Sequence, residues 1–197
     1  MTKTSKNIVV IGSEGVGKSS LCIRYAQGNF PKDHLPTQVV DTYQKWVPLN
    51  NKTTRNAFGS STKQIKLSII DTAGQEEMVC LLDKHLEKAD SVMIVLSLSD
   101  CKSLDRASSL YERSLCKFSK EEGRLQPIII VCNKSDLQET DPGSIKFNIE
   151  DIKAKLKGVN EKQIILASAL NDSNVKEAFD RAIELMGKQK KRKCNMM

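Results

Sequence analysis

Short apolar runs alternate along the chain with longer segments in which apolar residues recur at helical spacing. Residues 65–70 alternate apolar and polar positions, as a half-buried strand does, whereas residues 92–98 and 128–132 are apolar enough for strands buried on both faces. Strands that alternate with helices are typical of βα units around a largely parallel sheet. We therefore predict an α/β fold, a three-layer sandwich in which helices cover both faces of a mostly parallel six-stranded sheet. The predicted strands are 8–11, 42–49, 65–70, 92–98, 128–132 and 164–167, and the predicted helices are 18–26, 103–118, 149–156 and 175–186.

The polar segment 50–64 separates the second and third predicted strands and contains a Gly-Ser-Ser turn signal. It predicts a long hairpin loop, either a docking loop for a partner or a tolerated surface insertion. The 197 residues suffice for one compact domain with a modest tail. We predict that the domain covers residues 1–187 and that residues 188–197 form a flexible tail.

The composition is that of a globular protein and speaks against a membrane-spanning helix and a zinc site. Hydrophobic residues make up 39% of the chain and charged residues 28%, which is ordinary for a globular protein. The apolar runs are far shorter than the roughly 20 residues of a membrane-spanning helix, so we expect any membrane contact to be peripheral. Six cysteines without a C-x-x-C pair, and two histidines that are not spaced to complete a zinc site with them, predict free thiols.

Residues 12–19 (Gly-Ser-Glu-Gly-Val-Gly-Lys-Ser) fit the pattern G-x-x-x-x-G-K-[ST], after a predicted strand and at the start of a predicted helix. The glycines let successive backbone N–H groups point at one anion, and the helix N-terminus adds the positive end of its dipole. Lys18 supplies a positive charge, and the Ser19 hydroxyl can reach a magnesium ion. A nucleoside triphosphate is the expected ligand. The residues expected to bind it here are Gly15, Val16, Gly17, Lys18, Ser19 and Ser20.

Asp71 follows the third predicted strand, where a carboxylate can hold magnesium from a second side. An isolated Asp at a strand end is usually a helix cap or a turn residue, but this one opens the sequence Asp-Thr-Ala-Gly-Gln-Glu. Gly74 can bring its N–H to a terminal phosphate, and Gln75 can orient a water molecule for in-line attack. These residues predict phosphoryl transfer to water, in which Gln75 positions the water and Lys18 and magnesium stabilise charge.

Residues 133–136 (Asn-Lys-Ser-Asp) directly follow a buried predicted strand. The Asp136 carboxylate can accept two N–H bonds from guanine, from the ring N1 and the exocyclic amine, and adenine cannot offer that pair. A mismatched base would leave the carboxylate unpaired, at a cost of about 1–3 kcal/mol. We therefore expect Asn133, Lys134 and Asp136 to select guanine. A plain polar turn is the alternative for the four residues alone, and the preceding motifs weigh against it.

In their order along the chain, these motifs resemble those of the Ras superfamily of small GTPases, over nearly the whole sequence. The resemblance implies a P-loop NTPase fold of the small G domain type, with GTP or GDP bound and Mg²⁺ as the cofactor. It implies that Pro36 and Thr37 belong to the first switch and that Thr37 coordinates magnesium and closes over the γ-phosphate. It also implies that Phe30 packs on the guanine edge and that Ser168-Ala169 makes the last base contact, with the Ala169 N–H on the guanine carbonyl. An ordinary core aromatic and a plain strand-to-helix turn are the alternatives for these positions.

Several positions depart from the family pattern, although residues 75–77 and 97–104 look most like the Ras and Rap branch. Leu170 stands where the family usually has lysine, which costs little if its backbone contact to the nucleotide persists. Glu14 stands where Ras-branch members have glycine beside the γ-phosphate, and its bulk and charge predict slow, poorly stimulated hydrolysis, unless the side chain points into solvent. The switch after Thr37 is one residue longer, so the identity of the effectors cannot be carried over.

Basic residues cluster near the C-terminus. Five of the seven net positive charges come from residues 188–193, so the remaining +2 argues against a nucleic-acid partner. The final Cys-Asn-Met-Met fits the C-a-a-X pattern of a lipid-modified Cys194, usually farnesylated when Met is last. One lipid chain binds membranes only marginally, and the basic run supplies a second signal. We expect attachment to the inner leaflet of the plasma membrane; a nuclear import signal or a solvated helix end would not explain Cys194.

The expected function is that of a membrane-anchored guanine-nucleotide switch, monomeric, with exchange factor, activating protein and effectors bound through residues 32–43 and 73–82. The alternative is a GTP-locked effector-binding module with negligible GTPase activity. Residues 133–136 disfavour an ATP-dependent kinase or transporter subunit. No arginine of the chain can be named as a catalytic finger, and nothing in the sequence places Arg24, on the first predicted helix, in the site.

Overall fold

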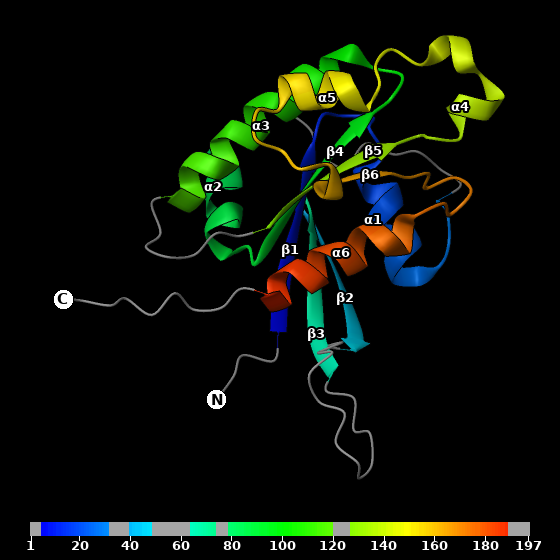
Figure 1. The fold of residues 1–197 in the computed structure, drawn as a ribbon. Coiled ribbons are helices and arrows are strands. Elements are labelled where there is room, and N and C mark those ends of the chain that lie inside the picture. Colours follow the sequence, from blue (N-terminus) through cyan, green and yellow to red (C-terminus); the bar gives the residue numbers. More distant parts are fainter. Residues whose placement is uncertain (1–4, 32–39, 49–63, 74–78, 120–126, 189–197) are drawn as a thin grey trace, which may run out of the picture.

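The computed structural model describes residues 5–31, 40–48, 64–73, 79–119 and 127–188. Within these residues a six-stranded sheet of order β2-β3-β1-β4-β5-β6 lies between two layers of helices (Figure 1). β2 and β3 pair antiparallel, and the other neighbouring strands pair parallel. The strands are β1 Ser5–Gly12, β2 Asp41–Pro48, β3 Gln64–Asp71, β4 Ser91–Ser97, β5 Ile128–Asn133 and β6 Ile164–Leu166. The helices are α1 Lys18–Gln27, α2 Val79–Lys88, α3 Cys101–Ser119, α4 Leu137–Thr140, α5 Ile149–Lys155 and α6 Val175–Lys188, with short 3-10 turns at Pro142–Ser144 and Glu161–Gln163. The predicted α/β sandwich is confirmed.

Each face of the sheet carries its own hydrophobic cluster. On one face α1 and α6 pack together, and the Tyr25 ring stacks on the fully buried Phe179 ring with their centroids 4.0 Å apart. On the other face α2, α3 and α5 contribute Leu86, Tyr111 and Ile152 to the second cluster. β4 is buried at every position because its alternate side chains enter both clusters, which explains why its sequence is continuously apolar.

Every predicted strand and helix differs from the observed one by one to three residues at one or both ends, and the helices α2 and α4 were not predicted. β3 begins at Gln64, so the predicted loop 50–64 overlaps the strand by one residue, and residues 50–63 lie outside the described part. α6 continues to Lys188, so the predicted tail 188–197 overlaps the helix, and its remaining residues lie outside the described part.

Two ion pairs connect α2 with α3. Arg113 on α3 donates two hydrogen bonds to the Asp83 carboxylate on α2, at 2.8 and 2.9 Å, and Lys117 forms an ion pair with Glu87 at 2.7 Å. The paired, two-pronged geometry of the arginine fixes the orientation of α2 as well as its distance from α3. None of the helices in the described residues combines the length and the apolar character that a membrane span needs.

Candidate functional site

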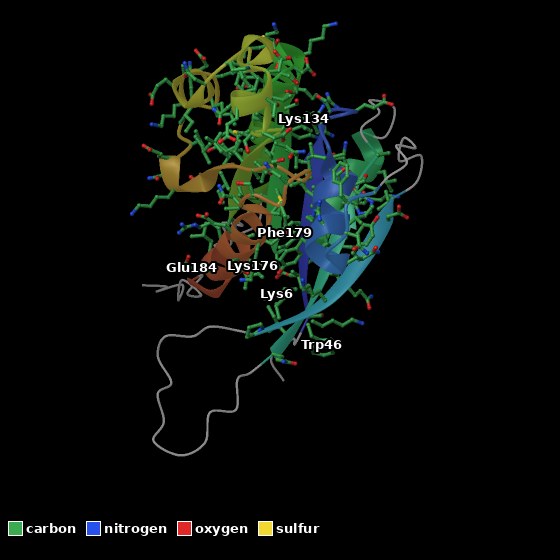
Figure 2. The ribbon with its side chains drawn as sticks, turned by 90° about the vertical axis from the view of Figure 1, so that its right-hand side faces the viewer. Lys6, Trp46, Lys134, Lys176, Phe179 and Glu184 are labelled. Atoms are coloured by element: carbon green, nitrogen blue, oxygen red, sulfur yellow. The ribbon has the colours of Figure 1, made fainter. Side chains whose placement is uncertain are left out.

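Four strand ends bring the sequence motifs to one edge of the sheet. β1 ends at Gly12, β3 at Asp71 and β5 at Asn133, and β6 leads into Ser168. The parallel register fixes their relative heights, because Val10 pairs with Asp71 across β1 and β3. Figure 2 shows Lys134, just after β5, at the opposite end of the molecule from Lys6 and Trp46. The carboxyl edge of a parallel sheet is where ligands bind in folds of this class.

The loop between β1 and α1 needs its glycines. At Gly12 a Cβ would lie 2.2 Å from the Val95 carbonyl oxygen of β4, so no side chain fits there. Gly17 precedes α1 with φ +92°, in the left-handed region, and its carbonyl accepts the Leu21 N–H at 3.0 Å. The turn therefore delivers the N-terminal amides of α1 to the edge of the sheet, where they can donate to an anion.

Lys18 is held inside this loop rather than in solvent. Its side chain is 6% exposed, and its Nζ donates to the Ser13 carbonyl oxygen at 2.8 Å. Burial lowers the pKa of Lys18, while the carboxylates of Asp71 and Glu14 act in the opposite direction. A buried ammonium that is fixed by the loop itself is well suited to pair with phosphate oxygens.

Asp71 meets the requirements of a magnesium ligand. The residue is 0% exposed, and in the described structure neither carboxylate oxygen has a hydrogen-bond partner of ordinary geometry. Burial raises the pKa of Asp71 to about 6, although the nearby Ser19 hydroxyl and the Lys18 ammonium favour its charged form. An unpartnered buried carboxylate is costly unless a cation completes it, and Mg²⁺ prefers oxygen ligands of this kind. Asp71 and Ser19 therefore fit the predicted metal.

Asn133 joins three of the predicted motifs. It is 2% exposed, its Nδ2 donates to the Val16 carbonyl oxygen at 2.8 Å, and its Oδ1 accepts the Ala169 N–H at 3.1 Å. A Cβ on Gly17 would lie 2.3 Å from that Nδ2, which is a second reason for glycine there. The Ala169 N–H is thus directed at Asn133 in this structure, and its contact with a guanine carbonyl stays a prediction.

The base-reading turn, residues 133–136, is also held by hydrogen bonds to the segment 167–168. Lys134 adopts a left-handed backbone conformation with φ +63°, and the Ser135 N–H donates to the Ala167 carbonyl oxygen at 3.0 Å. The buried Ser168 hydroxyl donates to Asp136 Oδ1 at 2.5 Å. This bond fixes the plane of a half-buried carboxylate, which is what the recognition of two parallel N–H groups requires.

Arg24 is the residue that the sequence interpretation missed. Nothing in the sequence placed it in the site, but the structure places its guanidinium on the carbonyls of Ala169 and Leu170 and 5.6 Å from the centroid of the half-buried Phe30 ring. Leu170 takes part through its backbone carbonyl, and the residue is 57% exposed. No local sequence signal links positions 145 residues apart.

The remaining predicted residues of the phosphate loop differ in burial, and several other predicted residues lie outside the described part. Val16 and Ser20 are buried, Ser19 is half-buried, and Gly15 and Glu14 are exposed. The predicted residues outside the described part are Pro36, Thr37, Gly74, Gln75 and Cys194. Their roles therefore stay predictions.

Comparison with known proteins agrees with this arrangement. The model of the Ras family matches residues 7–188. The chain is 28% identical to Ras-related protein Ral-B of Rattus norvegicus, over 87% of this chain and 74% of the relative. It is 30% identical to Ras-like protein RAS2 of Hydra vulgaris, over 95% and 93%, and 31% identical to Rho-related protein racC of Entamoeba histolytica, over 98% and 97%.

Proposed function

Because the chain belongs to the Ras family of small GTPases, we propose that it is a membrane-attached molecular switch that binds GTP and hydrolyses it slowly to GDP and phosphate. The observation that carries the proposal is that Asn133 joins the phosphate loop to the base-reading turn, at the same edge of the sheet as the buried Asp71 carboxylate. A nucleotide bound across this edge would contact both motifs at once. Guanine nucleotide and Mg²⁺ are the ligands of this family in general.

The proposed mechanism assigns each step to residues of the chain. The α1 N-terminal amides and Lys18 bind the phosphates, and Ser19, Thr37 and Asp71 would hold the metal. When bound, Mg²⁺ neutralises charge on the phosphate oxygens. Gln75 orients the attacking water, and Thr37 and Gly74 close over the γ-phosphate, so its loss releases both switch segments. Exchange factor, activating protein and effectors would bind through residues 32–43 and 73–82, to a monomer.

Slow hydrolysis is proposed from the position of Glu14. Its side chain is exposed in the phosphate loop, and its negative charge opposes the burial that lowers the pKa of Lys18. The same negative charge opposes the charge that spreads over the γ-phosphate in the transition state. If this repulsion made hydrolysis negligible, the protein would be the alternative considered above, a GTP-locked effector-binding module.

Attachment to the inner leaflet of the plasma membrane is proposed from the sequence of residues 188–197. Cys194 would carry the lipid, and the basic residues before it would add about 1 kcal/mol each at an anionic surface. Mass analysis of the C-terminal peptide of protein from eukaryotic cells should show a prenyl group on Cys194, and Cys194→Ser should abolish both the lipid and membrane recovery. Unmodified, fully soluble wild-type protein would exclude this part of the proposal.

The switch itself is tested by analysis of bound nucleotide followed by single-turnover hydrolysis. Wild-type protein should retain guanine nucleotide and convert GTP slowly, with no competition from excess ATP. Glu14→Gly should hydrolyse GTP about tenfold faster, which corresponds to about 1.4 kcal/mol in the barrier. Glu14→Gln, which keeps the size and removes the charge, separates the two causes. Unchanged rates in both variants, with and without an activating protein, would remove the argument for slow hydrolysis.

A further inference from the structure

The Arg24 guanidinium binds three backbone carbonyls that come from two separate segments. Nε donates to the Ala169 carbonyl oxygen at 2.9 Å, and Nη2 donates to that of Leu170 at 2.7 Å. Nη1 donates to the Gly28 carbonyl oxygen at 3.3 Å. A planar guanidinium can bind two successive carbonyls along one edge, whereas the ammonium of a lysine is a single point charge.

The first segment, residues 168–170, is tied to the base-reading side chains. The Ala169 N–H donates to Asn133 Oδ1, and the Ser168 hydroxyl donates to Asp136 Oδ1. The carbonyl oxygens of Ala169 and Leu170 accept hydrogen bonds from the Arg24 guanidinium on α1. Asp172 follows with a left-handed φ of +62°, so the turn after this segment is not in a relaxed conformation. Arg24 therefore holds the outer side of the loop whose inner side orients Asn133 and Asp136.

The second segment leads from α1 to Phe30. Gly28 ends the helix with φ +77°, and its N–H donates to the Arg24 carbonyl oxygen at 2.9 Å. Phe30 follows two residues later, with its ring under the Arg24 guanidinium. Both the backbone and the side chain of Arg24 thus fix the turn that presents Phe30, the residue expected on the edge of the guanine.

We propose that Arg24 is a positioning residue that slows the release of guanine nucleotide, by holding Phe30 and residues 168–170 together on either side of the base. This inference rests on the proposed function, because it needs guanine to lie between these segments. The competing explanation is that Arg24 only caps the last turn of α1, where a basic residue is favourable in any case. The two explanations differ in what the loss of the guanidinium does to bound nucleotide.

The experiment measures release of a fluorescent GDP from the full chain, loaded with GDP and Mg²⁺ and chased with excess unlabelled GDP. Arg24→Met should release GDP about tenfold faster than wild type, equivalent to about 1.4 kcal/mol. Arg24→Lys, which keeps the charge but not the planar fork, should fall between them. The matched control is Arg181→Met on α6, where the lost partners are the exposed carboxylates of Glu177 and Glu184, and its release rate should stay within about twofold of wild type.

Two further readouts separate positioning from general stability. Chelation of Mg²⁺ should accelerate release by the same factor in wild type and Arg24→Met, because in the described structure the guanidinium contacts are with Gly28, Phe30, Ala169 and Leu170 and not with Asp71 or Ser19. If folded Arg24→Met releases GDP at the wild-type rate, the proposal is wrong. It is also wrong if the variant loses as much thermal stability without nucleotide as with nucleotide bound. If Arg24→Met does not fold, a wild-type rate in Arg24→Lys overturns it. Absence of GDP binding by wild type would instead refute the proposed function.

Discussion

Replacing Asp71 with Asn should stabilise the nucleotide-free protein while removing its response to magnesium. The carboxylate is fully buried without a hydrogen-bond partner of ordinary geometry in the described structure, and burial raises its pKa from 3.8 to about 6. That rise corresponds to about 3 kcal/mol of destabilisation when the group is charged at neutral pH. An Asn side chain has nearly the same volume and no charge, but its amide must also be satisfied, so we expect a net gain of about 1–2 kcal/mol.

The assay is thermal unfolding of nucleotide-stripped protein, and of the same protein with GDP, with and without Mg²⁺. At about 2–4 °C per kcal/mol for a chain of this size, the nucleotide-free Asp71→Asn variant should melt about 2–8 °C above wild type. The increment that Mg²⁺ adds in the presence of GDP should largely disappear, because one of the residues proposed to hold the ion is lost.

Asp90→Asn is the matched control. Asp90 is also buried, but its carboxylate accepts hydrogen bonds from Lys6 Nζ at 2.8 Å and from the Asn7 N–H at 3.0 Å. Removing its charge should destabilise the protein by about 1–3 kcal/mol and leave the Mg²⁺ increment unchanged. If Asp71→Asn instead destabilised the nucleotide-free protein like Asp90→Asn and kept the Mg²⁺ increment, Asp71 would be a structural group and the reasoning would be wrong.

Three further predictions follow from the same edge of the sheet. Gly17→Ala should cost about 2–6 kcal/mol of stability, from left-handed backbone strain and from displacement of the buried Asn133 amide. Gly15 has φ +72° and open space where a Cβ would lie, so Gly15→Ala should cost only the backbone strain. Denaturant unfolding measures both free energies. Ser168→Ala removes the bond that orients the base-reading carboxylate. It should speed GDP release about tenfold and cost about 1–3 kcal/mol of stability, and an unchanged release rate would contradict that role. Because native Asp71 keeps its proton to higher pH than the unfolded chain, stability of metal-free and nucleotide-free protein should fall as pH rises from about 4 to about 6, and titration of Asp71→Asn should lack this slope.

The pattern of the sequence predicted the sheet because each strand has its own burial environment. β3 alternates because one side of it faces the core, and β4 is apolar throughout because both sides do. α2 was missed because its ten residues follow a polar segment and carry no strong start signal in the described part. α5 is shorter, but it begins after Asn148, whose side chain accepts the backbone N–H groups of Glu150 and Asp151.

The residues of the site could be predicted from the sequence, but the hydrogen bonds between them could not. Motif spacing identifies Lys18, Asp71 and Asn133 as residue types that the chemistry needs. It does not reveal that Asn133 binds the backbone of both Val16 and Ala169, because such bonds depend on the packing of segments far apart in sequence. The same reason hides Arg24, which acts on backbone carbonyls and so leaves no complementary side chain in the sequence.

Calorimetric titration of GDP and of ADP into nucleotide-stripped wild-type protein with Mg²⁺ tests the central claim most directly. The structure predicts saturable heat for GDP at one site, and binding of ADP weaker by about 5- to 150-fold, since adenine leaves the Asp136 carboxylate unpaired at a cost of about 1–3 kcal/mol. Equal affinity for the two nucleotides, or no heat with GDP from folded protein, would contradict it.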